Sequence, residues 1–228
     1  MNHLWTAVAD LRGRLADDLA TLGEEQWRSP SWCAGWTVED VVAHLSASAS
    51  TSPLGFVTGL AAAGLRRDRH TAAGVAANRG ATPSQTFERY GRLMTSTLAP
   101  PGPTATWLGE IVVHGEDIRR PLGLTGDCPR DLLRTVAVLY QRSDLAAGSR
   151  SRIRGLRLQA TDDAWTHGRG ELVEGPLLSL VLAMTGRGGA CADLTGPGVP
   201  TLLSRCSLPP AHGDPGEPAL TSRRSVAA

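Results

Sequence analysis

The sequence predicts a mainly helical protein: a helical bundle over residues 1–148, followed by a small α/β domain over residues 149–206. Three observations indicate this arrangement. Apolar residues recur every three or four positions through most of the first part, which is the period of an amphipathic helix. Residues 155–165, GLRLQATDDAW, instead alternate apolar and polar side chains, as half-buried strands do. Residues 207–228 are rich in Pro, Gly, Ser and Arg, so we expect a disordered tail.

The composition excludes several classes of protein. Hydrophobic residues make up 41% of the 228 residues and charged residues 20%, as in ordinary globular domains. The formal net charge of +1 provides no electrostatic surface for nucleic acid. The N-terminal residues lack the apolar core of a signal peptide, and the longest apolar run, GPLLSLVLAM, is too short to cross a bilayer. We therefore expect a cytoplasmic protein that binds neither nucleic acid nor membrane.

The cysteines and basic residues add two further indications. The four cysteines lie far apart without a CxxC pair, which argues against a structural zinc site and against a disulfide framework. All basic residues are arginines, and none is lysine. Together with the many alanines and glycines, this suggests a GC-rich coding genome.

The first two helices have clear sequence signals. Helical spacing over residues 2–22 is carried by Leu4, Val8, Leu11, Leu15, Leu19 and Leu22. A turn rich in Pro, Gly and Trp follows, with the sequence WRSPSWCAGW. The second helix begins at TVEDVVAHLSAS, where Thr37 and Asp40 have the spacing of a capping box, with Asp in place of Glu.

The rest of the bundle is expected to contain three more helices and a long loop. Residues 66–82 are polar and contain glycine, so we expect a loop there. A third helix is expected over residues 84–98, before the breaker APPGPT. A fourth covers GEIVVHGEDIRRPLG, residues 109–123, and ends at Pro121. Residues 130–147 give the last helix of the bundle.

The C-terminal part is expected to contain a strand, a turn and a short helix. The strand is the alternating stretch over residues 155–165, and THGRGE is expected to form the turn after it. GPLLSLVLAMTGRGG then predicts a short apolar helix that is ended by glycine.

The fourth helix carries an unusual pair of side chains. Glu110 and His114 are four residues apart, so they differ by only about 40° around the helix axis. They share a stripe with Trp107, Ile111, Asp117 and Ile118 that we expect to face the bundle interior. A bare carboxylate buried there would be strongly unfavourable unless it is paired or bound to a metal. The opposite side of this helix carries Gly109, Val112, Glu116, Arg119 and Arg120.

A second inward-facing histidine comes from the second helix. His44 lies on a stripe of apolar or small residues with Val41, Ala47 and Ser48. His44, Glu110 and His114 together offer two imidazoles and one carboxylate, which is a three-ligand set for Zn²⁺ or a similar divalent ion. Three protein ligands leave a coordination position open, as in catalytic sites.

Each of these residues also has a structural interpretation, and spacing alone leaves both open. His114 could be a hydrogen-bonded core histidine, and Glu110 could pair with an arginine of a neighbouring helix. Asp40 is better explained as a helix cap than as a ligand. Cys33 could be a reactive thiol, although a buried packing cysteine is commoner. The remaining histidines are expected at the surface or the termini: His3, His70, His167 and His212.

Two motifs make the sequence resemble a known family. SPSWCAGWTVEDVVAHL resembles the signature at the second helix of the mycothiol-dependent maleylpyruvate isomerase family, and GEIVVHGEDIRRPLG resembles that family's second signature. LRLQATDDAW, GPLLSLVLAMTGR and DLTGPGVPTLL are similar to its C-terminal domain. The resemblance covers nearly all of residues 1–206.

The resemblance implies a fold, a metal and a cosubstrate. The fold would be a DinB-like four-helix bundle with a small α/β domain after it. The family's metal ligands map onto His44 of the first motif and onto Glu110 and His114 of the second. Zn²⁺ is the usual metal there, and mycothiol is the thiol cosubstrate. Arg187 is the best match to a C-terminal arginine that is implicated in function in the family. An actinobacterial origin would fit mycothiol and the all-arginine composition.

The resemblance leaves several functions open. The first is a mycothiol S-transferase that acts on a small electrophile in detoxification or secondary metabolism, and the second is a maleylpyruvate-type cis–trans isomerase. A thiol-independent metalloenzyme and a non-catalytic binding module are further alternatives. Arg66, Arg67 and Arg69 could bind an acidic substrate or the cosubstrate, or form a solvated charge run. We expect a monomer or a homodimer.

Overall fold

The structure, a computed structural model, describes residues 3–144 and 147–206 and confirms a mainly helical fold with a small sheet near the C-terminus. The predicted tail over residues 207–228 lies outside the described residues. The helical part contains α1 (His3–Leu19), α2 (Glu24–Arg28), α3 (Val38–Ser50), α4 (Pro53–Ala62), α5 (Arg67–Asn78), α6 (Pro83–Gly91), α7 (Thr104–Arg119), the 3₁₀ turn η1 (Arg120–Leu122) and α8 (Arg130–Tyr140). The C-terminal part contains α9 (Ser149–Arg152), β1 (Leu156–Ala160), β2 (Thr166–Gly168), β3 (Glu171–Gly175), α10 (Leu177–Met184), the 3₁₀ segment η2 (Gly188–Asp193) and α11 (Val199–Cys206).

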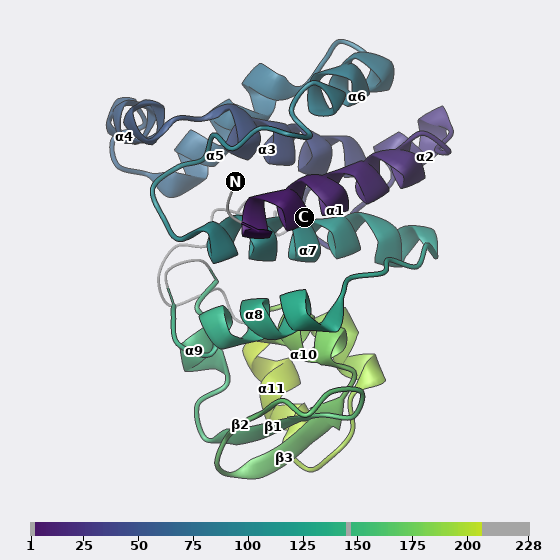
Figure 1. Cartoon of the computed structure of the whole chain (residues 1–228), viewed down its shortest axis with the longest axis vertical. Helices are drawn as coiled ribbons and strands as arrows, with labels where there is room; N and C mark the ends of the chain where they lie inside the picture. The colour runs from purple at the N-terminus through teal and green to yellow at the C-terminus, as the bar shows by residue number, and fades with distance from the viewer. Residues whose placement is uncertain (1–2, 145–146, 207–228) are drawn as a thin grey trace, which may run out of the picture.

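The helices and the sheet occupy opposite ends of the molecule. Figure 1 shows α1 to α7 stacked at one end, the three strands at the other, and α8 between α7 and α10. The predicted division at residue 148 stays a prediction, because α8 packs against both α7 and α10. Among the described residues, no helix is long and apolar enough to cross a membrane.

The first two predicted helices form where the sequence indicates. The apolar spacing of α1 buries Val8, Leu15 and Leu19 almost completely. At the start of α3, the Thr37 hydroxyl accepts a hydrogen bond from the Asp40 amide, and the Asp40 carboxylate accepts one from the Thr37 amide. The capping box is therefore confirmed: the Thr37 hydroxyl satisfies an orphan amide of the first helical turn, and the Asp40 carboxylate satisfies the amide of the N-cap residue.

The predicted loop over residues 66–82 is wrong, because most of it is the helix α5. Polarity and glycine content predict a loop here, but the alanines of this segment favour helix formation. α5 lies against α3, and Gly74 permits the approach: a Cβ atom at this position would lie 3.3 Å from the Cβ atom of Ala47. No residue of α5 is fully buried, so its sequence lacks the apolar stripe that reveals α1.

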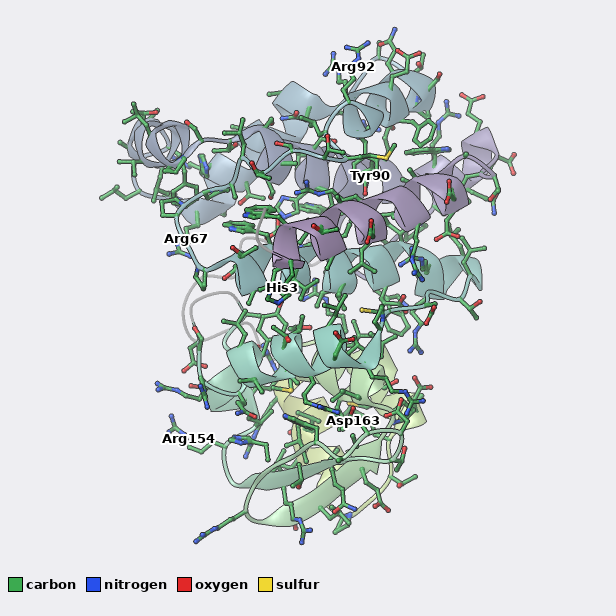
Figure 2. All side chains as sticks on the ribbon, viewed as in Figure 1. His3, Arg67, Tyr90, Arg92, Arg154 and Asp163 are labelled. Carbon is green, nitrogen blue, oxygen red and sulfur yellow. The ribbon has the colours of Figure 1, made fainter. Side chains whose placement is uncertain are left out.

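Two predicted helices are shorter in the structure. The helix expected over residues 84–98 is α6, which ends at Gly91, and the helix expected over residues 130–147 is α8, which ends at Tyr140. Tyr90 of α6 points toward α1, where its hydroxyl donates a hydrogen bond to the carbonyl of Arg12 (Figure 2). This contact fixes α6 on the bundle although the helix is short.

α7 is the central helix, and both of its sides are buried. It packs against α1, α3 and α8. The side opposite the predicted metal ligands includes Glu116 and Arg119, which are 4% and 8% exposed. Arg119 forms a 2.7 Å ion pair with Asp18 of α1, and Glu116 forms a 3.1 Å ion pair with Arg120. Their burial is tolerated because the charges are paired.

The sheet has β1 at its centre, antiparallel to β2 and parallel to β3. The strand predicted over residues 155–165 forms only over Leu156–Ala160, as β1. The turn predicted at THGRGE is wrong in its first half, because Thr166–Gly168 is β2. β3 carried no recognised signal. Gly168 and Gly170 have φ values of +82° and +129°, which glycine adopts without strain. These glycines let the chain reverse its direction between the end of β2 and the start of β3, which only two residues separate. The predicted apolar helix is α10, and it is almost entirely buried.

Candidate metal centre

α3 and α7 lie side by side and bring His44, Glu110 and His114 together. One potential ligand atom from each residue lies within 4.8 Å of the other two. His44 Nε2 is 3.2 Å from Glu110 Oε1, and the two imidazole rings are 4.9 Å apart at an angle of 78°. As the four-residue spacing along α7 predicts, Glu110 and His114 lie on the same side of the helix, and both face His44. We call these three residues the metal cluster.

The donor atoms of the metal cluster fit a divalent metal ion. Tetrahedral bonds of about 2.0 Å to nitrogen and oxygen would place neighbouring ligand atoms about 3.3 Å apart. The observed 3.2 Å between His44 and Glu110 matches that spacing. The three side chains retain 17%, 19% and 15% exposure for His44, Glu110 and His114. The cluster is thus partly buried but accessible, which is the condition for a site with an open coordination position.

Glu110 is held in its ionised form by its surroundings. Burial alone would raise the pKa of this carboxyl, but the hydrogen bond with His44, the charges of His44 and His114, and the hydroxyl of Ser48 outweigh it. The pKa is lowered to about 2. Ser48, one turn after His44 on α3, donates its hydrogen bond to the same carboxylate oxygen that faces His44. A carboxylate is the form in which glutamate binds metal ions.

His114 makes its second contact with a fully buried carboxylate. Its Nδ1 atom lies 2.9 Å from Oδ2 of Asp117, one turn later on α7. Arg187, which follows α10, donates from Nε to Asp117 Oδ1 at 3.0 Å and from Nη2 to Oδ2 at 2.7 Å. Burial would raise the pKa of Asp117, but Arg187 and His114 lower it overall. Through Arg187, the C-terminal part therefore contacts the carboxylate that is bonded to His114.

The segment before α3 closes another side of the metal cluster. An isolated bridge between Pro30 and Thr37 folds this segment back on itself, and the ring of Trp36 lies 5.1 Å from that of His44. The amide of Trp32 donates to the carbonyl of Asp117 at 2.9 Å. Cys33 is buried, and its sulfur forms a second group with His114 and Asp117 whose potential ligand atoms lie within 4.8 Å of one another.

Sequence reasoning identified the three cluster residues but missed the role of their neighbours. Asp117 follows His114 by three residues on the same helix, so the spacing could have indicated their contact. Ser48 shares the inward stripe of His44, but its bond is to Glu110 of the neighbouring helix α7. The approach of Cys33 and Arg187 had no local signal, because both come from segments that are distant in sequence from Asp117.

The other predicted site residues lie elsewhere. Arg66 and Arg67 lie at the exposed start of α5, where Arg66 pairs with Asp68 at 2.6 Å, and Figure 2 shows Arg67 at the edge of the helical part. Their role in substrate binding stays a prediction. His70 packs against Phe56, with ring centroids 5.1 Å apart, so it is less exposed than expected. His167 stacks on Trp165 in the sheet.

Comparisons with known proteins agree with this architecture. Residues 8–100 match the family described as the mycothiol maleylpyruvate isomerase N-terminal domain. Two crystal structures of the mycothiol-dependent maleylpyruvate isomerase, one of a histidine-to-alanine mutant, are similar to this chain, with TM-scores of 0.58 and 0.56. The sequence identities are 18% and 20%, over 86% of this chain and 92% of each of theirs. At these identities the similarity shows the fold. No curated protein matches the chain by sequence.

Proposed function

Since residues 8–100 belong to the mycothiol maleylpyruvate isomerase N-terminal domain family, we propose that this protein is a cytoplasmic, mycothiol-dependent metalloenzyme. Its reaction is the addition of the thiol to a small electrophile, as an S-transferase in detoxification or secondary metabolism. The observation that carries the proposal is the convergence of His44, Glu110 and His114 from two helices. Two imidazoles and an ionised carboxylate, all partly exposed, are a donor set for a catalytic divalent ion, most simply Zn²⁺.

The residues of the site have separate roles. His44, Glu110 and His114 would hold the ion, which when bound lowers the pKa of a coordinated thiol from about 8.5 and so supplies a thiolate at neutral pH. Ser48 orients the carboxylate of Glu110. Trp36 packs beside His44, with the two rings 5.1 Å apart, and restrains the orientation of the imidazole. In a substitution, the sulfur forms a bond to an electrophilic carbon while the leaving group departs with the electrons of its own bond to that carbon. In an addition, the sulfur bonds to one carbon of a double bond and the neighbouring carbon takes a proton from solvent.

Isomerisation of a maleylpyruvate-type substrate is the second candidate. The two similar crystal structures are of an enzyme with that name, and this observation favours it. The thiol would add to a carbon–carbon double bond, the resulting single bond would rotate, and the thiol would leave with the double bond restored. Such a substrate carries carboxylates and needs cationic partners. Arg66 and Arg67 are the predicted candidates, and mutating both to Gln would raise KM for an acidic substrate if they serve this purpose.

Metal content is the first measurement. Elemental mass spectrometry of the purified protein is expected to find about one divalent ion per chain, and the ion should be largely lost in His114→Ala. The matched control is His167→Ala, because His167 is also half-buried but stacks on Trp165 in the sheet. Absence of metal from the wild type, even after incubation with Zn²⁺, Ni²⁺ or Fe²⁺, would reject the proposed function.

Thiol dependence then separates the remaining alternatives. Consumption of mycothiol with an electrophilic probe such as monochlorobimane indicates the S-transferase. Catalytic mycothiol, not consumed while an unsaturated diacid is isomerised, indicates the isomerase. Turnover without thiol would assign the ion a Lewis-acid role. Stoichiometric metal without any turnover would indicate a binding module.

A further inference from the structure

We propose that Asp117 is the positioning residue of the metal cluster, and that Arg187 acts on the cluster through Asp117. The inference rests on the proposed function, because it concerns the same site. In this arrangement Asp117 fixes the imidazole of His114, and the C-terminal part fixes Asp117. Correct docking of the C-terminal part then becomes a condition for high metal affinity.

The first step concerns the proton on His114. An ionised carboxylate only accepts hydrogen bonds, so the 2.9 Å contact with Asp117 Oδ2 requires the proton to be on Nδ1 of His114. In the neutral form of the ring, which is the form that binds a metal, the lone pair is then on Nε2. Asp117 has a side-chain exposure of 0%, so no water can replace it as the acceptor. A carboxylate behind a ligating histidine sets both the tautomer and the ring orientation.

The second step concerns what holds Asp117. Arg187 binds both carboxylate oxygens with two of its nitrogens, at 3.0 and 2.7 Å, the bidentate geometry in which arginine is most selective. Its third nitrogen donates to the carbonyl of Thr185 at 3.0 Å, which ties the guanidinium to the end of α10. Asp117 therefore cannot rotate without breaking contacts to a segment 70 residues later in the chain.

The third step concerns the segment before α3. The backbone carbonyl of Asp117 accepts a hydrogen bond from the amide of Trp32, and Trp32 packs against the segment η2 that follows Arg187. Four residues after Trp32, the ring of Trp36 lies 5.1 Å from that of His44. Asp117 thus joins three segments that surround the metal cluster: α7, the residues after α10, and the loop before α3.

The fourth step separates this role from direct substrate binding by Arg187. The side chain of Arg187 is 12% exposed, and its guanidinium nitrogens face Asp117 and Thr185. A substrate carboxylate would have to displace Asp117 to gain the same bidentate contact. The geometry therefore favours an effect of Arg187 on metal binding over an effect on substrate affinity.

Titration with Co²⁺ tests the proposal, because its visible absorption reports the geometry of the ligand set as well as the affinity. Asp117→Asn is expected to weaken Co²⁺ binding about 10- to 100-fold, the usual effect of losing such a partner, and to change the absorption spectrum. Arg187→Gln should also weaken binding. The double variant should bind about as weakly as Asp117→Asn alone, because residues that act through one chain of contacts are not additive.

A matched control and a second variant make the result decisive. Asp163 is also a buried carboxylate bonded to an arginine, Arg134, at 2.7 Å, so Asp163→Asn should leave Co²⁺ binding unchanged. If Asp117→Asn does not fold in its metal-free form, Arg187→Lys replaces it, because lysine keeps the charge but cannot bind both carboxylate oxygens. It should weaken binding and alter the spectrum without lowering the melting temperature of the metal-free protein to the same degree as Arg187→Gln.

The outcomes distinguish this inference from the proposed function. Co²⁺ binding by the wild type, with unchanged affinity and spectrum in Asp117→Asn and Arg187→Lys, would overturn the positioning role alone. Full additivity of Asp117→Asn and Arg187→Gln would assign Arg187 an independent role and overturn the second half of the proposal. No binding of Co²⁺ or Zn²⁺ by the wild type would overturn both the inference and the proposed function.

Discussion

Ser48 is the smallest side chain on which the metal cluster depends. Its hydroxyl donates to the Glu110 oxygen that faces His44, so it holds the carboxylate in the orientation that converges with both imidazoles. Ser48→Ala is expected to weaken metal binding about 10-fold, at the lower end of the range for partners of metal ligands. Isothermal titration with Zn²⁺ measures this effect.

The same helix offers the control for this prediction. Ser46 is fully buried, but its hydroxyl donates to the carbonyl of Val42 within α3. Ser46→Ala should leave Zn²⁺ affinity unchanged, even if it alters stability. Equal affinities for Ser48→Ala and the wild type would show that the Ser48 hydroxyl does not orient Glu110.

Asp193 gives a pH-dependent prediction away from the metal cluster. Burial would raise its pKa, but the Ser179 hydroxyl and the Arg120 guanidinium lower it overall. A lowered pKa means that the carboxylate stabilises the fold above its unfolded-state pKa of about 4, and that this contribution is lost as pH falls through the folded-state pKa. Because the side chain is 37% exposed, we expect at most about 0.5 kcal/mol.

Urea unfolding at two pH values tests the role of Asp193. Asp193→Asn should have a lower urea midpoint than the wild type at pH 6. The difference should be smaller at pH 3, below the unfolded-state pKa of about 4, because the contribution of the carboxylate is lost as pH falls toward its lowered folded-state pKa. A difference that is the same at both pH values would mean that the ion pair with Arg120 does not contribute.

The contact between α7 and α8 depends on a glycine. A Cβ atom at Gly109 would lie 2.5 Å from the hydroxyl of Tyr140, which is 5% exposed and enclosed in the core. Gly109→Ala is therefore expected to destabilise the protein by about 1–3 kcal/mol, the usual effect of overpacking. Chemical denaturation with circular dichroism measures the change.

Gly13 provides the opposite expectation in a comparable helical position. A Cβ atom there would meet nothing within 4 Å in α1, so only helix propensity changes. Gly13→Ala should stabilise the protein by up to about 1 kcal/mol. If Gly109→Ala also stabilises the protein, the backbone of α7 at Gly109 does not lie as close to the Tyr140 hydroxyl of α8 as the structure indicates.

The elements differ in how far the sequence could predict them. α1 and α3 were predictable because an apolar stripe and a capping box are local signals, and Glu110 and His114 were placed on one face by the period of α7 alone. α5 was missed because its stability comes from alanine propensity and from packing on α3, neither of which produces an apolar stripe. β2 and β3 are short strands whose pairing with β1 is a non-local property.

The candidate site shows the same division between local and distant contacts. The spacing of Glu110 and His114 and the inward stripe of His44 indicate that the three side chains face one another, while their role as ligands depends on the resemblance as well. The contact between Arg187 and Asp117 could not be predicted from periodicity, because it depends on how the C-terminal part docks on α7. The resemblance to a family indicated Arg187, but not that its guanidinium would face a carboxylate of the same chain.

The whole chain should be stabilised by the metal, because the ligands come from two helices of the core. A ligand at about 100 times its dissociation constant stabilises the folded state by about 2.7 kcal/mol. For a protein of this size, that corresponds to a rise in Tm of about 5–10 °C. Differential scanning fluorimetry with and without Zn²⁺ should detect the shift in the wild type and find it absent in Glu110→Gln.

The segments that the metal stabilises show how the helical part and the C-terminal part are connected. α10 packs on α8, and Arg187 after α10 binds Asp117 behind the metal cluster. Hydrogen exchange measured by mass spectrometry should therefore show slower exchange with Zn²⁺ not only in α3 and α7 but also in residues 177–189. In Arg187→Gln the slowing should be confined to α3 and α7, because the connection to the cluster is removed.

The edge strand β2, which pairs only with β1, is the internal control and should exchange at the same rate with and without Zn²⁺. Slowing confined to α3 and α7 in the wild type would mean that the helical and C-terminal parts respond to the metal independently.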